Sequence, residues 1–139
     1  MIELAVKLKL LKLYAHMAHN LVKGESFLAD HEFLGDIYDK MDGHYDDVIE
    51  RMIGLDMEPN IAQINLEAAK RLQVTGGKVA DCHEAFGTVL GRLNAICETI
   101  EQECKDPNKS QGTIQLLGGM ADEFEMLKYK LKQRLKEQY

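Results

Sequence analysis

Apolar residues recur every three to four positions over most of this chain, and that spacing places them on one face of an α-helix. Four long segments show it. They cover about residues 2–22, a run from the cap-type side chains at 26–30 to about 54, about 78–104, and a run from Ser110 or Thr113 to the chain end. Because the chain has only two prolines, Pro59 and Pro107, few helix breakers interrupt these runs. Four long helices are therefore predicted.

The interval from residue 57 to residue 76 has a different pattern. It opens as a loop at Glu58-Pro59-Asn60, continues with helical periodicity over 61–72, and ends in Val74-Thr75-Gly76-Gly77. A long connection of this kind is required in a bundle when the helices before and after it run parallel. We therefore predict an all-α fold, a four-helix bundle with a long mid-chain crossover that carries a short helix.

Length and charge narrow the class of protein. A chain of 139 residues with 45% apolar content is enough for one core, so residues 1–139 are expected to form a single domain. The formal net charge of -6 argues against a surface that broadly coats DNA, although local basic patches remain open. An acidic balance also suits a protein that attracts cations.

The chain is expected to be cytoplasmic, with no membrane association. Its first residues lack the uninterrupted apolar core and cleavage site of a signal peptide, and no apolar run approaches the ~20 residues that span a bilayer. The three cysteines, Cys82, Cys97 and Cys104, form no Cys-x-x-Cys pair, so neither a disulfide framework nor a zinc knuckle is indicated. Ordinary burial is the simplest interpretation of all three.

Four residues form a candidate metal site: His19, His31, Asp46 and Glu50. Imidazole and carboxylate are the ligand types that suit Fe(II) and similar divalent ions. If one helix carries His31 and both carboxylates, the helical rise puts His31 about 22 to 28 Å from them, too far for one ion to bridge. Two copies packed antiparallel about a two-fold axis near Lys40 would instead make two identical sites per dimer.

The alternative to a metal site is that Asp46 and Glu50 simply lie on an acidic helix face exposed to solvent. Carboxylates four positions apart are common on helix surfaces, and this segment is rich in acids, so the pair alone is weak evidence. The acids are Glu32, Asp36, Asp39, Asp42, Asp46 and Asp47. Of the other histidines, His16 is expected to pack beside the site, and His44 and His83 to be structural or surface residues.

The spacing of these residues resembles the DNA-protection-during-starvation proteins (Dps, or miniferritins) of the ferritin-like superfamily. The family motif runs from a histidine late in the first helix, through a Lys/Arg-Gly turn and a Phe, to a second histidine and then Asp-x-x-x-Glu-Arg. The corresponding residues here are His19, Lys23-Gly24, Phe27, His31 and Asp46-Asp-Val-Ile-Glu50-Arg51, without insertion or deletion. Gly112-Thr113-Ile-Gln-Leu116-Leu117, followed by Glu125 and Leu127, matches the late helix.

The resemblance implies a homo-dodecameric shell built from two-fold dimers. Such a protein is a ferroxidase: it binds Fe(II) at di-iron sites shared across the two-fold dimer interface, oxidises it preferably with hydrogen peroxide, stores ferric mineral inside and so protects against oxidative stress. Carried over by position, His19, His31, Asp46 and Glu50 are the iron ligands and catalytic residues. The same transfer puts His19 with a carboxylate partner on one side of each site and His31 on the facing subunit.

Two positions depart from the family motif. Gly35 stands where an Asp usually follows the second histidine, so a second iron is expected to bind weakly, and Asn20 replaces a Trp. These changes leave an alternative open: a ferritin-like helical assembly or DNA-binding protein with weak or lost ferroxidase activity.

DNA binding is possible but not favoured. Five cations lie between Lys128 and Lys136, but they also suit a helix C-terminus, and no lysine-rich extension precedes the first helix.

Overall fold

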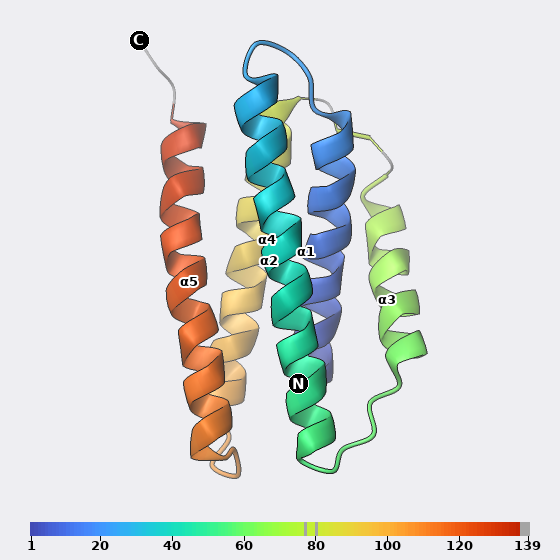
Figure 1. The fold of residues 1–139 in the computed structure, drawn as a ribbon, viewed down its shortest axis with the longest axis vertical. Coiled ribbons are helices and arrows are strands. Elements are labelled where there is room, and N and C mark those ends of the chain that lie inside the picture. The colour runs from blue at the N-terminus through green and yellow to red at the C-terminus, as the bar shows by residue number, and fades with distance from the viewer. Residues whose placement is uncertain (77, 80, 137–139) are drawn as a thin grey trace.

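The computed structural model describes residues 1–76, 78–79 and 81–136 (Figure 1). Within these residues all regular secondary structure is helical. The helices are α1 (Ile2–Leu21), α2 (Phe27–Gly54), α3 (Ile61–Val74), α4 (Cys82–Cys104) and α5 (Gln111–Leu135). The predicted all-α fold is confirmed, including the short helix in the crossover.

Figure 1 shows how the crossover sets the topology. The long helices α1, α2, α4 and α5 lie side by side, and α3 lies outside this bundle, next to α1. α2 and α4 run in the same direction, so the chain must return along the bundle between them, and α3 makes that return. This is the arrangement that the long connection predicted.

Side-chain caps explain where several helices begin. Asn60 accepts a hydrogen bond from the backbone N–H of Gln63 at the start of α3, and Asp81 accepts one from Glu84 at the start of α4. The third long helix therefore begins at Cys82, after its Asp81 cap, and not at about residue 78. The last helix ends at Leu135, so its predicted continuation into residues 137–139 lies outside the described residues.

The core is formed by the inner faces of the four long helices. Their largest fully buried side chains are Leu4, Leu8, Leu11, Leu34, Ile37, Met41, Met52, Phe86, Leu93, Ile96, Ile100 and Phe124. Burial of one such side chain contributes about 1.5–3 kcal/mol before the entropic cost of ordering is subtracted. α3 buries only Ile64 and Ala68, so it is an attached helix and not a fifth member of the bundle.

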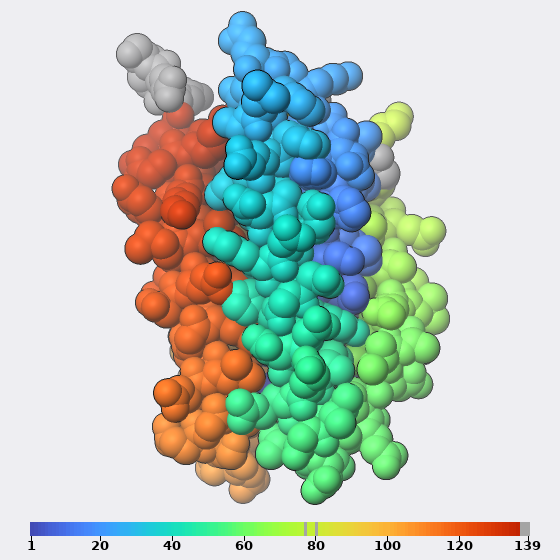
Figure 2. Space-filling model, in the orientation of Figure 1, coloured from blue at the N-terminus to red at the C-terminus, as the bar shows by residue number. Residues whose placement is uncertain are grey.

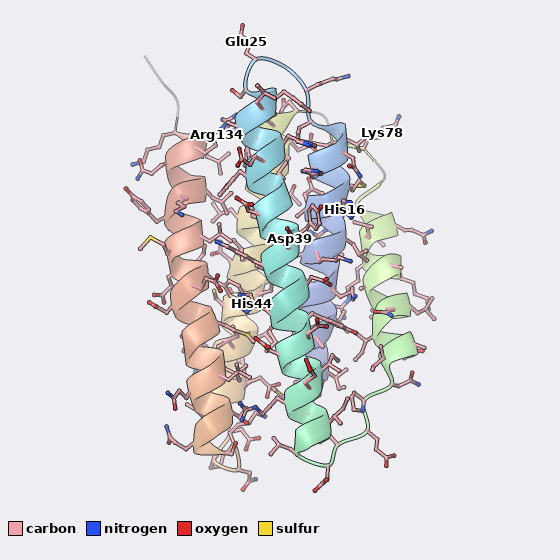
Figure 3. All side chains as sticks on the ribbon, in the orientation of Figure 1. His16, Glu25, Asp39, His44, Lys78 and Arg134 are labelled. Carbon is pink, nitrogen blue, oxygen red and sulfur yellow. The ribbon has the colours of Figure 1, made fainter. Side chains whose placement is uncertain are left out.

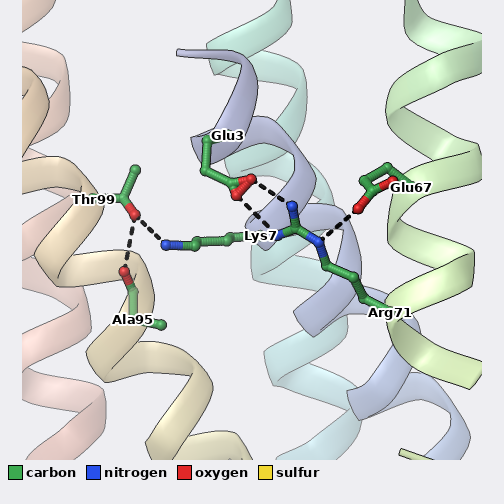
Figure 4. A network of polar contacts seen from close by, with 6 residues as sticks. All are labelled: Glu3, Lys7, Glu67, Arg71, Ala95 and Thr99. Carbon is green, nitrogen blue, oxygen red and sulfur yellow. Dashed lines mark hydrogen bonds and ion pairs between the residues drawn. The ribbon is translucent and has the colours of Figure 1, made fainter. Parts of the chain in front are cut away.

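Polar contacts hold α3 and α4 to α1 (Figure 4). Arg71 of α3 donates to both carboxylate oxygens of Glu3 at 2.9 and 2.7 Å, and its Nε donates to Glu67 at 3.1 Å. On the other side of α1, the ammonium of Lys7 donates to the hydroxyl of Thr99 on α4 at 2.6 Å. These contacts fix α1 between its neighbours, which matters because α1 carries His19.

Among the described helices, none is both long enough and apolar enough to cross a lipid bilayer.

Candidate metal centre

His19 and His31 lie face to face. His19 is in the last turn of α1 and His31 in the first turns of α2, and the short turn between the helices returns the chain through Gly24 at φ 110°. The two imidazole rings stack with centroids 3.6 Å apart and planes 19° from parallel. The turn between α1 and α2 therefore builds a two-histidine unit within one protomer.

Reciprocal hydrogen bonds fix both rings. Nδ1 of His19 lies 2.5 Å from the carbonyl oxygen of His31, and Nδ1 of His31 lies 2.6 Å from the carbonyl oxygen of His19. Because a carbonyl oxygen only accepts, each Nδ1 must carry the proton and donate. In the neutral rings each Nε2 then keeps its lone pair, which is the tautomer that metal-binding histidines adopt when their other nitrogen is held by a carbonyl.

Neighbouring groups support the stacked pair. Phe27 lies on the other face of His31, with ring centroids 4.8 Å apart. Gly35 lies against His19, so close that a β-carbon at this position would come within 3.1 Å of the ring. The pair is thus enclosed between an aromatic ring and the backbone of α2, and its orientation is set before any ligand arrives.

Asp30 anchors the start of α2 just before His31. Its side chain is 4% exposed and accepts from Nη2 and Nε of Arg134 at 2.9 and 3.2 Å. The hydrogen bond to Asp30 raises the pKa of the Arg134 guanidinium, which also packs 5.1 Å above the ring of Phe86. Figure 3 shows Arg134 at the same end of the bundle as Glu25, in the turn between α1 and α2.

The carboxylates of Asp46 and Glu50 lie at the other end of the same helix. Both side chains are exposed on the C-terminal half of α2, which runs without interruption from Phe27 to Gly54. The helical rise therefore puts them about 22 to 28 Å from His31 within one protomer. In the part of the chain that the structure describes, no three His, Cys, Asp or Glu side chains gather to hold an ion.

One feature of the expected ligand arrangement is wrong. The motif transfer put His19 on the same side of the site as a carboxylate and His31 on the facing subunit. The structure instead groups His19 with His31, because the hairpin between α1 and α2 brings their rings into contact. One protomer therefore presents both imidazoles at the start of α2 and both carboxylates near the end of α2.

The end of α2 that carries Asp46 and Glu50 borders an open hollow and has cations nearby. An open hollow of about 450 Å³ lies beside this end of α2, and its lining includes Asp47, Glu50 and Arg51 of α2 and Leu116 of α5. The ammonium of Lys9 lies 4.1 Å above the ring of Tyr45, next to Asp46 in the sequence. This end thus combines exposed carboxylates with nearby cations.

The remaining histidines lie outside the two-histidine unit. His16 is exposed and stacks on Tyr38, and His44 pairs with Glu123 of α5 and contacts the edge of Phe124. His83 is exposed at the start of α4. These positions agree with the expected packing and surface roles.

Sequence reasoning missed two residues near the imidazoles. Tyr38 lies two helical turns after His31 and so shares its face, a signal that periodicity could have supplied. Arg134 gave no such signal, because it is 104 residues from the carboxylate it binds.

A family model described as a ferritin-like domain matches residues 3–138. No curated protein matches the chain significantly.

Proposed function

The chain belongs to the ferritin-like domain family, and from that premise we propose that it is a miniferritin of the Dps type. In this proposal Fe(II) is the substrate, hydrogen peroxide the preferred oxidant, and ferric mineral the product stored in a dodecameric cytoplasmic shell. The protein would act as a ferroxidase that limits oxidative stress. Membership in the family indicates iron binding and storage in general, and the arrangement of the candidate ligands supports the finer assignment.

The observation that carries the proposal is the separation of the two halves of the ligand set on one helix. Two oriented Nε2 atoms, of His19 and His31, stand at the start of α2, and two carboxylates, of Asp46 and Glu50, stand near its end. A second copy of α2 packed antiparallel would bring imidazoles against carboxylates twice, once at each end. Each two-fold dimer would then hold two equivalent sites.

The exposed face of α2 fits such a contact. Figure 2 shows α2 uncovered from end to end on one face of the protomer, between α5 and the α1/α3 side. The residues midway between His31 and the carboxylates are Asp39 and Lys40, both exposed. In an antiparallel pair, Asp39 of each copy would lie near Lys40 of the other, so the contact would be closed by two reciprocal ion pairs.

The donor chemistry suits Fe(II) oxidation. Imidazole nitrogens bind Fe(II) at neutral pH, and carboxylate oxygens favour the ferric product, which is the harder ion. With only four protein donors at each site, coordination positions remain open for peroxide.

One observation favours a second candidate, a ferritin-like assembly with weak ferroxidase activity. Gly35, beside His19, provides no side-chain donor, so each site lacks the additional carboxylate that a second iron would use. DNA binding has less support, since the basic run near the C-terminus lies on α5, where Leu131 is buried in the core and Lys132 and Arg134 favour the helix dipole.

The decisive experiment uses two single variants, His31→Ala and Glu50→Ala, assembled separately and together. Each alone should lose peroxide-dependent Fe(II) oxidation. In a mixed dimer, one site combines the intact imidazoles of one chain with the intact carboxylates of the other. Random co-assembly should therefore restore about a quarter of the parent sites, because half the dimers are mixed and each carries one intact site.

His83→Ala, an exposed histidine on α4, is the matched control and should oxidise Fe(II) at the parent rate. If co-assembly restores nothing while each variant still forms the helical oligomer, the site is not shared and the proposal is wrong. If either single variant oxidises Fe(II) at the parent rate, the residue replaced in that variant is not an iron ligand. Sizing of the iron-loaded assembly separates a storage protein from a helical assembly without activity.

A further inference from the structure

His16 lies on the surface of α1 that faces α2, one helical turn before His19 (Figure 3). Its exposed imidazole stacks on Tyr38 of α2, with centroids 4.3 Å apart and planes 16° from parallel. The ring of Tyr38 is itself beside Gly35, because its Cε2 atom lies 3.8 Å from the place that a β-carbon at Gly35 would take. The stack thus holds the imidazole of His16 at the level of Gly35 along α2.

His16 does not complete a three-histidine site with His19 and His31. The ring centroids of His16 and His19 are 6.3 Å apart, whereas those of His19 and His31 are 3.6 Å apart. Over the residues that the structure describes, no three His, Cys, Asp or Glu side chains are placed to hold one ion. An ion bound by His16 is therefore a second ion, next to the one assigned to the two-histidine unit.

The antiparallel contact of two α2 helices supplies a carboxylate at each of these levels. With the two-fold axis near Lys40, residues equally distant from Lys40 lie opposite each other on the two copies. Glu50 of the partner subunit then comes opposite the turn of α2 that carries His31. Asp46 of the partner subunit, one turn closer to the axis, comes opposite the turn that contains Gly35. The level of His16 thus receives a carboxylate of its own.

The spacing of these groups suits two neighbouring ions. The helical rise separates His16 from His19 by about 4.5 Å along α1, and Asp46 from Glu50 by about 6 Å along α2. Two-metal sites place their ions about 3.5–4 Å apart. Ligands offset by one turn on facing helices can therefore serve adjacent ions, Glu50 with the two-histidine unit and Asp46 with His16. Gly35 itself adds no side chain at this level.

We propose that His16, together with Asp46 of the partner subunit, holds a second Fe(II) beside the first, an inference that rests on the proposed ferroxidase function. Imidazole with carboxylate is the same donor chemistry as at the first position. Two Fe(II) at one site supply both electrons that one peroxide takes up: two Fe(II), one hydrogen peroxide and two protons give two Fe(III) and two water molecules. His16 thereby takes the place of the donor that Gly35 does not provide.

Two substitutions of His16 distinguish a metal ligand from a packing residue. His16→Phe keeps a ring against Tyr38 and removes both nitrogens, whereas His16→Asp loses the stack and keeps a donor atom. The assembled protein is titrated with Co(II) in a calorimeter. The parent and His16→Asp should bind two Co(II) per protomer, and His16→Phe one. If His16→Phe binds as many Co(II) as the parent, or if His16→Asp loses an ion as well, His16 is not a ligand.

Asp36→Asn is the matched control, because Asp36 is an exposed carboxylate next to Gly35 on α2. This variant should bind two Co(II) per protomer. Loss of an ion in Asp36→Asn but not in His16→Phe would assign the second position to Asp36 and overturn the proposal.

Anomalous diffraction from Co(II)-soaked crystals tests the parent itself, so the result does not depend on the folding of a variant. Two peaks about 3.5–4 Å apart at each dimer site, one of them bonded to His16, support the second position. A single peak on His19 and His31 overturns it and leaves the ferroxidase proposal intact. The absence of a peak at all three histidines overturns both.

Discussion

The imidazole of His19 lies directly against the backbone of α2 at Gly35. A β-carbon at this position would come within 3.1 Å of both Nδ1 and Cε1 of the ring, closer than ordinary van der Waals contact. The same Nδ1 donates to the carbonyl of His31. Gly35 therefore has a steric role in this chain: it leaves room for the ring that presents Nε2 of His19.

Substitution of Gly35 by Ala should separate stability from metal binding. Alanine favours an internal helical position by up to about 1 kcal/mol, so unfolding should change little or shift slightly upward. The added methyl group displaces the His19 ring and strains its bond to the His31 carbonyl. The affinity for Co(II), used as an air-stable probe, should fall about 10-fold. Loss of a hydrogen bond that holds a metal ligand in place lowers metal affinity by about 10- to 100-fold, and we expect the lower end of that range.

Calorimetric titration of Gly35→Ala against Gly43→Ala checks this. Gly43 is also in α2, but open space surrounds its Cβ position, so it reports the helix effect alone. Equal Co(II) affinities for the two variants would show that the close approach has no role.

The Asp30–Arg134 pair should contribute to stability and to the orientation of His31. Arg134→Gln leaves a buried carboxylate without its cation, which should cost about 1–3 kcal/mol, reduced because Arg134 is itself 37% exposed. Urea denaturation measures the loss, with the exposed Lys132→Gln on the same helix as the control. The double variant Asp30→Asn/Arg134→Gln should recover part of it, since no buried charge remains. An unchanged unfolding midpoint for Arg134→Gln would contradict the buried-pair interpretation.

The Glu3–Arg71 pair should give a pH-dependent contribution to stability. The hydrogen bond from Arg71 lowers the pKa of Glu3 below its usual 4.5 in the folded state. The native state then binds fewer protons than the unfolded state, so the stabilisation is complete above pH 4.5 and is lost as pH falls through the lowered pKa. Because both side chains are more than a third exposed, its size is at most about 1 kcal/mol.

Thermal unfolding of Arg71→Gln checks this sign. The variant should be less stable than the parent at pH 7, and the difference should shrink as pH falls below 4.5. Lys70→Gln, exposed on the same helix, should show no such convergence. If the difference in stability between the parent and Arg71→Gln grows as the pH falls, the Glu3–Arg71 pair does not stabilise the fold through an ionised Glu3.

Charge reversal at the middle of α2 should test the antiparallel contact. Asp39→Lys would replace two attractive ion pairs per dimer with two repulsive ones and should raise the dimer dissociation constant several-fold. The double variant Asp39→Lys/Lys40→Asp restores the pairing with the signs exchanged and should recover assembly, as measured by sedimentation velocity. If the double variant dissociates as readily as the single one, α2 does not pack with the two-fold axis near Lys40.

The helices of this protein could be predicted from the sequence because helical periodicity and capping are local. Residues 2–22 and the run that ends near 54 matched α1 and α2 to within a few positions, since apolar spacing, Gly24 and the cap-type residues act over one or two turns. The start of α4 was misplaced by four residues, because the weak apolar pattern before Cys82 was followed past the Asp81 cap.

The sequence by itself also determined that His31 and the two carboxylates cannot meet within one chain, because a continuous helix fixes their separation. Only the tertiary structure decided that His19 belongs with His31, that Gly35 makes room for its ring, and that Arg134 anchors Asp30. These contacts depend on how two helices cross or on where a distant segment packs. The local spacing of residues along the chain contains no information about either.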